Sequence, residues 1–371
     1  MLIIFVSIIG NTYGQSILKL NKQGLKAYKA GNYTEAATLL EKAKAQSEKK
    51  LKKKFSEEQD YGSTMNNLGM VYLKQTKYKE AEVLLLDALG IYKKVSTGIN
   101  ADYIETLDNL ANLYGKLSDD SREELFNLEA LEKKKKFLGE KHESYGLSLN
   151  NLGVLYMKQG YYIKAEPFLV KALEITKITK GAEHINYASA LNNLGAFYDR
   201  QGNTEKAEPL FLEALPLYKK LGKEGEESYG ISLQNLSKFY SKRKNYSKAE
   251  PFYIDFTEFV KNTYGEKHIN YAITLNSLGI FYKKQEKYDT ARITYLTALK
   301  VYENIAGKNN EDYADCLRNF AITYICEQKY KEVKPILLEI LEIRKKVLPA
   351  NHPNLLESEQ DVQIVKEKLG E

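Results

Sequence analysis

Apolar residues along the chain follow the period of an amphipathic α-helix, interrupted by short turns. Leu149, Leu152 and Tyr156 stand at i, i+3 and i+7, which predicts one face of a first helix. A turn at 159–161 follows, and a second amphipathic run extends over 165–175. This pattern predicts two antiparallel helices. A single pair of this kind cannot bury its apolar face alone, so neighbouring pairs must stack.

The same pattern returns every 42 residues along most of the chain. One tyrosine ladder comprises Tyr61, Tyr103, Tyr145, Tyr187, Tyr229, Tyr271 and Tyr313, and a second comprises Tyr72, Tyr114, Tyr156, Tyr198, Tyr240, Tyr282 and Tyr324. Small residues recur between them, for example Gly153 in the first helix and Ala165 in the second, and they allow the paired helices to approach closely. Copies in one unbroken register predict a solenoid of stacked helix pairs.

These copies resemble the tetratricopeptide repeat in its 42-residue form, which is similar to the repeats of kinesin light chain. The residues that carry the resemblance are 187–195 (YASALNNLG), 201–202 (QG) and 206–210 (KAEPL), and the pattern recurs around Tyr145 and Tyr271. The resemblance implies an all-α fold, a right-handed superhelical solenoid of antiparallel helix pairs. It also implies that one face of the first helices lines a concave groove that binds peptides.

We expect eight repeat units over residues 18–354, with the first copy offset by 45 residues from the second. The expected units are 18–60, 61–102, 103–144, 145–186, 187–228, 229–270, 271–312 and 313–354. Residues 355–371 should form a C-terminal helix that caps the last unit, because a terminal repeat must present a polar outer face.

The third copy departs from the pattern. Residues 118–121 (SDDS) replace the usual turn, and Glu123 stands where the other copies have a packing alanine. Residues 121–124 have the form of a capping box, so the second helix is expected to survive with a shifted start. In the last copy Val333 and Ile340 fill the small-residue positions. We interpret these departures as local repacking.

The N-terminus reads as an export leader. Residues 2–9 (LIIFVSII) form an apolar run of the length of a signal h-region, and a cut after Gly14 is expected, which makes residues 1–14 the leader. No Lys or Arg precedes the run, so an upstream start, a first strand or a first helix stay open. The protein is exported, periplasmic or secreted, if the leader is cleaved, and otherwise cytoplasmic. No stretch is long enough to span a membrane.

Composition leaves little material for catalysis. The 371 residues carry a net charge of +6, with four histidines and two cysteines. The histidines His142, His184, His268 and His352 share one register in the loops between units, too far apart to collect around one metal ion, so they are interpreted as turn or capping residues. No nucleophile motif or phosphate-binding loop is present. We therefore expect no catalytic residues, no metal site and no cofactor.

The first helices carry a polar stripe on the face that the core does not use. Its predicted peptide-binding residues are Asn66, Lys74, Lys116, Asn150, Lys158, Asn192, Arg200, Lys242, Asn276 and Lys284. In the resembled family, amide side chains on this face grip the peptide backbone. The basic members also stand where a lysine would end a helix next to its negative dipole pole, and the residues alone leave both interpretations open. A groove with this stripe would prefer an acidic segment or a free carboxylate.

The sequence therefore predicts a non-enzymatic scaffold or adaptor that binds a peptide or protein. The alternative is the sensor or regulatory region of a larger caspase-like peptidase or signalling kinase system, because arrays of this type often accompany such domains. A nucleic-acid partner is not expected: the basic runs 49–54 and 133–136 are followed by acidic residues and are interpreted as solvated helix surface.

Overall fold

The computed structural model describes the backbone of residues 2–51, 58–95 and 101–371, and the side chains of residues 16–49, 58–94 and 101–371. This part of the chain consists of helices and contains no strand, which confirms the expected all-α fold. None of its helices is both long and apolar enough to cross a bilayer. The predicted leader lies outside the described side chains and stays a prediction.

The chain divides into two compact units, Met1–Gln201 and Gly202–Glu371, and the division falls inside the predicted repeat unit 187–228. Helices of the first unit are α1 (Leu2–Lys29), α2 (Tyr33–Leu51), α3 (Glu58–Lys74), α4 (Tyr78–Val95), α5 (Ala101–Lys116), α6 (Asp120–Leu138), α7 (Glu143–Lys158), α8 (Tyr162–Lys180) and α9 (Ile185–Arg200). The second unit contains α10 (Thr204–Lys220), a 3₁₀ turn (Gly222–Glu224), α11 (Glu226–Lys242), α12 (Tyr246–Tyr264), α13 (Ile269–Lys284), α14 (Tyr288–Ala306), α15 (Glu311–Cys326), α16 (Tyr330–Val347) and α17 (Pro353–Leu369).

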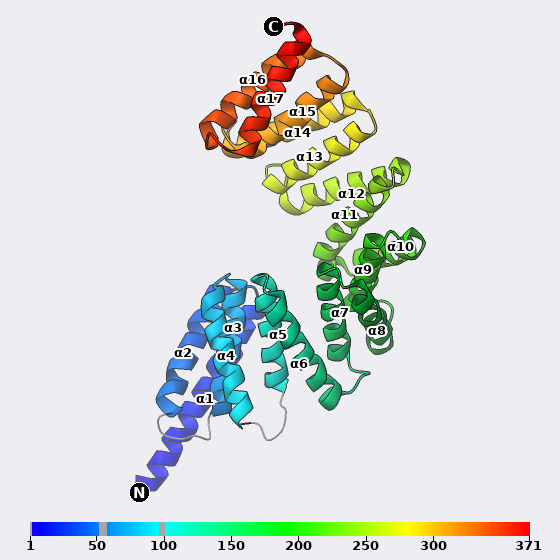
Figure 1. Ribbon diagram of the computed structural model, residues 1–371. Coiled ribbons are helices and arrows are strands. Elements are labelled where there is room, and N and C mark those ends of the chain that lie inside the picture. Colours follow the sequence, from blue (N-terminus) through cyan, green and yellow to red (C-terminus); the bar gives the residue numbers. More distant parts are fainter. Residues whose placement is uncertain (1, 52–57, 96–100) are drawn as a thin grey trace. The chain divides into compact units, whose positions relative to one another are not determined.

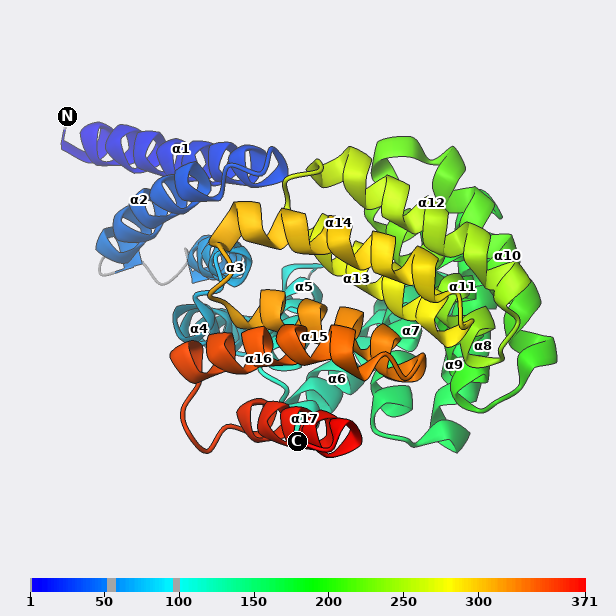
Figure 2. The same cartoon turned by 90° about the horizontal axis from the view of Figure 1, so that it is seen from above.

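Within each unit, helices follow one another as antiparallel neighbours. Both views show this clearly for α13 to α17 (Figures 1 and 2). We call the odd-numbered helices A helices and the even-numbered helices B helices, because an A helix and the next B helix correspond to the first and second helix of a copy. Each A helix also packs against the B helix of the copy before it, as α3 does on α2 and α13 on α12.

Glycine at one position of the A helix allows the helices of a pair to approach closely. A Cβ added at Gly153 would lie 2.6 Å from Cγ of Leu169, and one added at Gly279 would lie 2.5 Å from Cε1 of Tyr295. Real Cβ atoms do not approach so closely, so a larger residue at either place would force the helices apart.

The second tyrosine ladder joins each copy to the one before it. Tyr156 on α7 donates a hydrogen bond of 2.8 Å to Glu124 on α6, and Tyr240 on α11 donates one of 2.8 Å to Glu208 on α10. Burial, together with this carboxylate, raises the pKa of Tyr156 to about 12. In the last copy the glutamate position holds Arg292, whose guanidinium lies 4.9 Å from the ring centre of Tyr324. The acid–phenol bond is replaced there by a cation–π contact.

The second helix of the third copy does not have a shifted start, contrary to the sequence-based expectation. Helix α6 begins at Asp120, the register at which α4 and α8 begin. Its N-cap is Asp119, whose side chain accepts a hydrogen bond from the backbone N–H of Arg122, so residues 121–124 are not the cap. Asp119 takes this role because its carboxylate already stands before the first turn, where it favours the helix dipole.

Helix α17 closes the second unit with a two-sided pattern. Leu355, Val362 and Val365 are buried against the rest of the unit. Glu359 and Gln363 are exposed on the other side, at the positions where earlier A helices carry a buried apolar residue and a small residue. This pattern favours the expected capping role of residues 355–371, which stays a prediction.

Candidate peptide-binding face

The predicted stripe follows three positions of each A helix, the register of Asn150, Val154 and Lys158 on α7, and we call the surface at this register the A face. Its six basic residues are Lys74, Lys116, Lys158, Arg200, Lys242 and Lys284, and all six side chains are exposed. Among the residues that the structure describes, none of the six makes an ion pair. Lys29 occupies the same place at the end of α1 and is exposed as well. Lys29 stands 45 residues before Lys74, so a search at steps of 42 residues does not find it.

The asparagines of the stripe are engaged between repeats. Asn193 on α9 donates its Nδ2 to Oδ1 of Asn150 on α7 at 3.0 Å, and Asn319 on α15 donates to Asn276 on α13 at 3.3 Å. At Asn150 and Asn276 one of the two lone pairs of the carboxamide oxygen that could receive a peptide N–H is thus already engaged. The sequence signal for these bonds is an asparagine 43 positions after another, as in the pairs Asn150/Asn193 and Asn276/Asn319.

Asn66 lies in the interior and not on the surface. Its side chain is 2% exposed, and its Oδ1 accepts hydrogen bonds from Thr106 at 3.1 Å and from Asn109 at 3.0 Å. The structure therefore gives this predicted peptide-binding residue a packing role between α3 and α5. Asn150, Asn192 and Asn276 are half-buried.

Between α5 and α7 a buried lysine takes the place of the hydrogen bond between asparagine side chains. The stripe residue there is Asp108, and Lys134 of α6 donates to it at 2.7 Å and to Ser148 Oγ at 2.7 Å. Burial raises the pKa of Asp108, and the ammonium of Lys134 opposes that shift. Lys134 is 3% exposed, so the interpretation of run 133–136 as solvated surface is wrong at this residue. Run 49–54 lies largely outside the described side chains.

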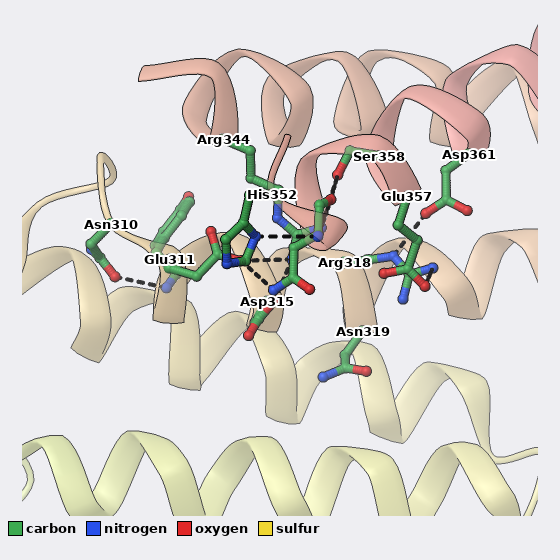
Figure 3. A network of polar contacts seen from close by, with 12 residues as sticks. Asn310, Glu311, Asp315, Arg318, Asn319, Arg344, His352, Glu357, Ser358 and Asp361 are labelled. Carbon is green, nitrogen blue, oxygen red and sulfur yellow. Dashed lines mark hydrogen bonds and ion pairs between the residues drawn. The ribbon is translucent and has the colours of Figure 1, made fainter. Parts of the chain in front are cut away.

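The same arrangement returns at the end of the chain, around Arg344 of α16. Its guanidinium is 1% exposed, pairs with Glu311 at 3.1 Å and with Asp315, and donates to Ser358 Oγ of α17 at 2.8 Å (Figure 3). Lys134 and Arg344 occupy one repeat register, and each reaches a serine fourteen residues later. Long basic side chains at this position lock the next A helix in place by charge-assisted bonds.

The A face ends at α15. The stripe position there is Arg318, which pairs through Nε with Asp361 at 2.7 Å and through Nη2 with Glu357 at 2.9 Å, both on α17 (Figure 3). The next position at the register of the basic residues is Cys326, which is exposed and not in a disulfide, so the basic row stops at Lys284. The cations of the last copy therefore fasten the closing helix, and the exposed row of cations belongs to the copies before it.

The histidines are capping residues, as expected. His142 Nδ1 accepts from the backbone N–H of Ser144 at 3.2 Å, and His268 Nδ1 accepts from that of Asn270 at 3.1 Å. His184 and His352 cap α9 and α17 in the same way. The described residues contain no cluster of three His, Cys, Asp or Glu side chains that could hold a metal ion.

Comparison with solved structures gives relatives of the same fold. PH0952 of Pyrococcus horikoshii, a STAND protein with a tetratricopeptide repeat sensor, is 15% identical over 92% of this chain and 50% of that chain, with a TM-score of 0.60. BtubC (BKLC) of P. vanneervenii is 18% identical over 62% and 91%, with a TM-score of 0.54. The apo quorum sensor NprR of B. thuringiensis is 18% identical over 96% and 99%, with a TM-score of 0.51.

At these identities the likeness concerns the fold alone. No curated protein matches the sequence. A family model described as tetratricopeptide repeat matches residues 60–136, 144–220, 228–304 and 272–346, which together cover well over half of the chain. The chain therefore belongs to the tetratricopeptide repeat family.

Proposed function

We propose that this protein is a non-catalytic scaffold or adaptor that binds a peptide or protein on its A face. The observation that carries the proposal is an exposed cation at the end of each A helix from α3 to α13, four in the first unit and two in the second, with no ion pair among the described residues. Unpaired surface charges in regular order attract a partner of opposite sign, so the partner should present carboxylates. The half-buried amides of Asn150 and Asn276 beside the row can add donors to such a partner.

A helix-dipole role predicts the same residues, because each of the six lies in the last turn of its helix. Three B-helix lysines provide the control. Lys94, Lys136 and Lys219 also lie in the last turn of their helices and are exposed. Reversing charge in either set should disturb helix dipoles to the same degree, whereas only the A face should lose a partner.

The test is affinity capture with the full chain as bait, followed by peptide identification. The triple variant K158E/R200E/K242E should lose the captured partner, and salt should affect its remaining binding less than it affects the unaltered protein. The control K94E/K136E/K219E should capture as the unaltered protein does. Equal capture by all three proteins would rule out the A face as the binding surface.

A second candidate function is that of a sensor region in a larger signalling system. The likeness to PH0952 supports it, because that protein carries a tetratricopeptide sensor and this chain spans half of its length. A His/Cys dyad of a caspase-like peptidase, or a kinase domain, encoded next to this chain would favour it. Export from the cytoplasm is a separate proposal, and a mature chain that begins at Gln15 would support it.

A further inference from the structure

The A face of the second unit carries an apolar row as well as a basic one, on α11 and α13. We infer that this face binds an acidic amphipathic α-helix, with its apolar side on Ile231 and Ile273 and its carboxylates on Lys242 and Lys284. The inference deepens the proposed function and rests on it, since it names the class of partner for the same face.

The apolar row stands near the beginning of both helices. Ile231 is 49% exposed and Ile273 is 48% exposed, one repeat apart in the same register. The copies on either side have polar residues at this place, Ser189 and Asp315. Two exposed isoleucines at equivalent places on consecutive A helices form an apolar strip that water solvates poorly.

The basic row stands at the other end of the same two helices. Lys242 and Lys284 are exposed, as is Lys238 one turn before Lys242, and none of them makes an ion pair among the described residues. Half-buried Lys283 lies at the same end: burial lowers its pKa, Cys326 opposes that shift, and the positive charges of Arg318 and Lys284 add to it. An anion placed there would relieve this repulsion.

The distance between the apolar row and the basic row sets the width that a ligand needs in order to contact both. Ile231 and Lys242 are eleven residues apart on one helix, as are Ile273 and Lys284, which at 1.5 Å per residue is about 16 Å. A helix with its side chains is about 10–12 Å across, and lysine side chains reach over the remainder. A helix laid across α11 and α13 can therefore touch both rows at once.

The middle of the face favours a helix over an extended chain. The Oδ1 of Asn276 already accepts one hydrogen bond from Asn319, and one turn further along α13 stands the half-buried, apolar Ile280. An extended ligand must find acceptors for its backbone N–H groups, and here Asn276 has one lone pair left while Ile280 has no acceptor in its side chain. A helix satisfies its backbone internally and needs only the two rows of side chains.

Three synthetic probe peptides of about 20 residues test the inference by fluorescence anisotropy with the full chain. The first has Leu and Glu on opposite sides at the helical period, the second has the same composition in strict alternation, and the third has Lys in place of Glu. The first should bind and should become helical by circular dichroism on binding. The second should bind at least about tenfold more weakly, and the third should not bind.

Variants with matched controls test whether the first probe peptide binds to both rows. Variants K242E/K284E and I231Q/I273Q should each weaken binding about tenfold, because each removes one row. Controls K300E/K331E and I293Q/L296Q change exposed residues of the same kind on B helices of the same unit, and should bind within about twofold of the unaltered protein.

The outcomes separate the inference from the proposed function. Tighter binding of the alternating peptide, abolished by K242E/K284E, would overturn the helical ligand and keep the A face as the binding surface. Failure of all probes, while K158E/R200E/K242E still loses its captured partner, would also overturn only the inference. Failure of the probes together with unchanged capture by that triple variant would overturn both.

Discussion

Asn193 donates its side-chain amide to Oδ1 of Asn150 across 3.0 Å, from one A helix to the A helix before it. The two residues are 43 positions apart, one more than the repeat period, so each copy can offer its neighbour an acceptor at one position and a donor at the next. The stripe that the sequence predicts as a ligand-binding surface thus also contains a hydrogen bond that joins neighbouring repeats, here called the joint.

This joint predicts a local loss of stability in Asn193→Ala. The change removes the donor and leaves the half-buried Oδ1 of Asn150 without it, which should cost about 1 kcal/mol in the opening free energy of α9. Hydrogen exchange of the α9 amides measures that quantity. Asn151 is the matched control, because it stands at the same register, is exposed, and follows by 43 positions Asp108, which is already bonded to Lys134. Asn151→Ala should change the opening free energy by less than about 0.5 kcal/mol.

Arg344→Met should release the closing helix α17. Methionine keeps much of the volume but leaves Glu311 and Asp315 without the cation, and because these two carboxylates are partly exposed the loss should be about 1–3 kcal/mol. Amides of α17 should exchange much faster than those of α13. Lys346→Met is the control on the same helix, since Lys346 is exposed and pairs with Glu342 of α16 itself. Equal protection of α17 in both variants would contradict a role for Arg344 in holding it.

Gly115 and Glu123 should behave as a coupled pair. A Cβ at Gly115 would lie 3.0 Å from the carboxyl carbon of Glu123, which fills the alanine position of the third copy. Gly115→Leu, the residue found one repeat earlier at Leu73, should destabilise by about 1–3 kcal/mol through overpacking. Adding Glu123→Ala should recover most of that loss, because alanine leaves room for the new side chain. A double-mutant cycle by urea unfolding tests the coupling, and additive losses would contradict it.

Lys283→Met should stabilise the protein at neutral pH. The pKa of Lys283 in the folded protein is lowered from 10.5, so folding disfavours its charged form. The charged ammonium therefore opposes folding at pH 7. This penalty falls as the pH rises through the folded-state pKa and is gone above the unfolded-state pKa, where the side chain is neutral in both states. The variant should melt higher at pH 7, and its advantage should shrink as the pH approaches 10.5. Thermal unfolding monitored by circular dichroism at pH 7, 9 and 10 measures this trend. An advantage that grows with pH would contradict the assigned cause.

Much of the fold was predictable because the same residues recur at a fixed spacing in successive copies. Tyr156 and Leu152 recur at one spacing in copy after copy, and each copy needs its neighbours to bury them. The capping role of the histidines was also predictable, since His142 and His268 stand directly before a helical pattern. The start of α6 was predicted wrongly because two caps competed within four residues, and Asp119 had the better placement.

The family, the helix pairs and the order of the A-face cations can be read from the residues alone, because apolar periodicity and repeat register are local properties that each copy shows. Which polar residues are engaged depends on how the helices pack. Asn66, Lys134 and Arg344 resemble exposed residues in the sequence, but each is buried and bonded to partners in neighbouring helices. The physical reason is that a buried polar group is stable only where packing brings donor and acceptor together, and stacking of the repeats creates that proximity.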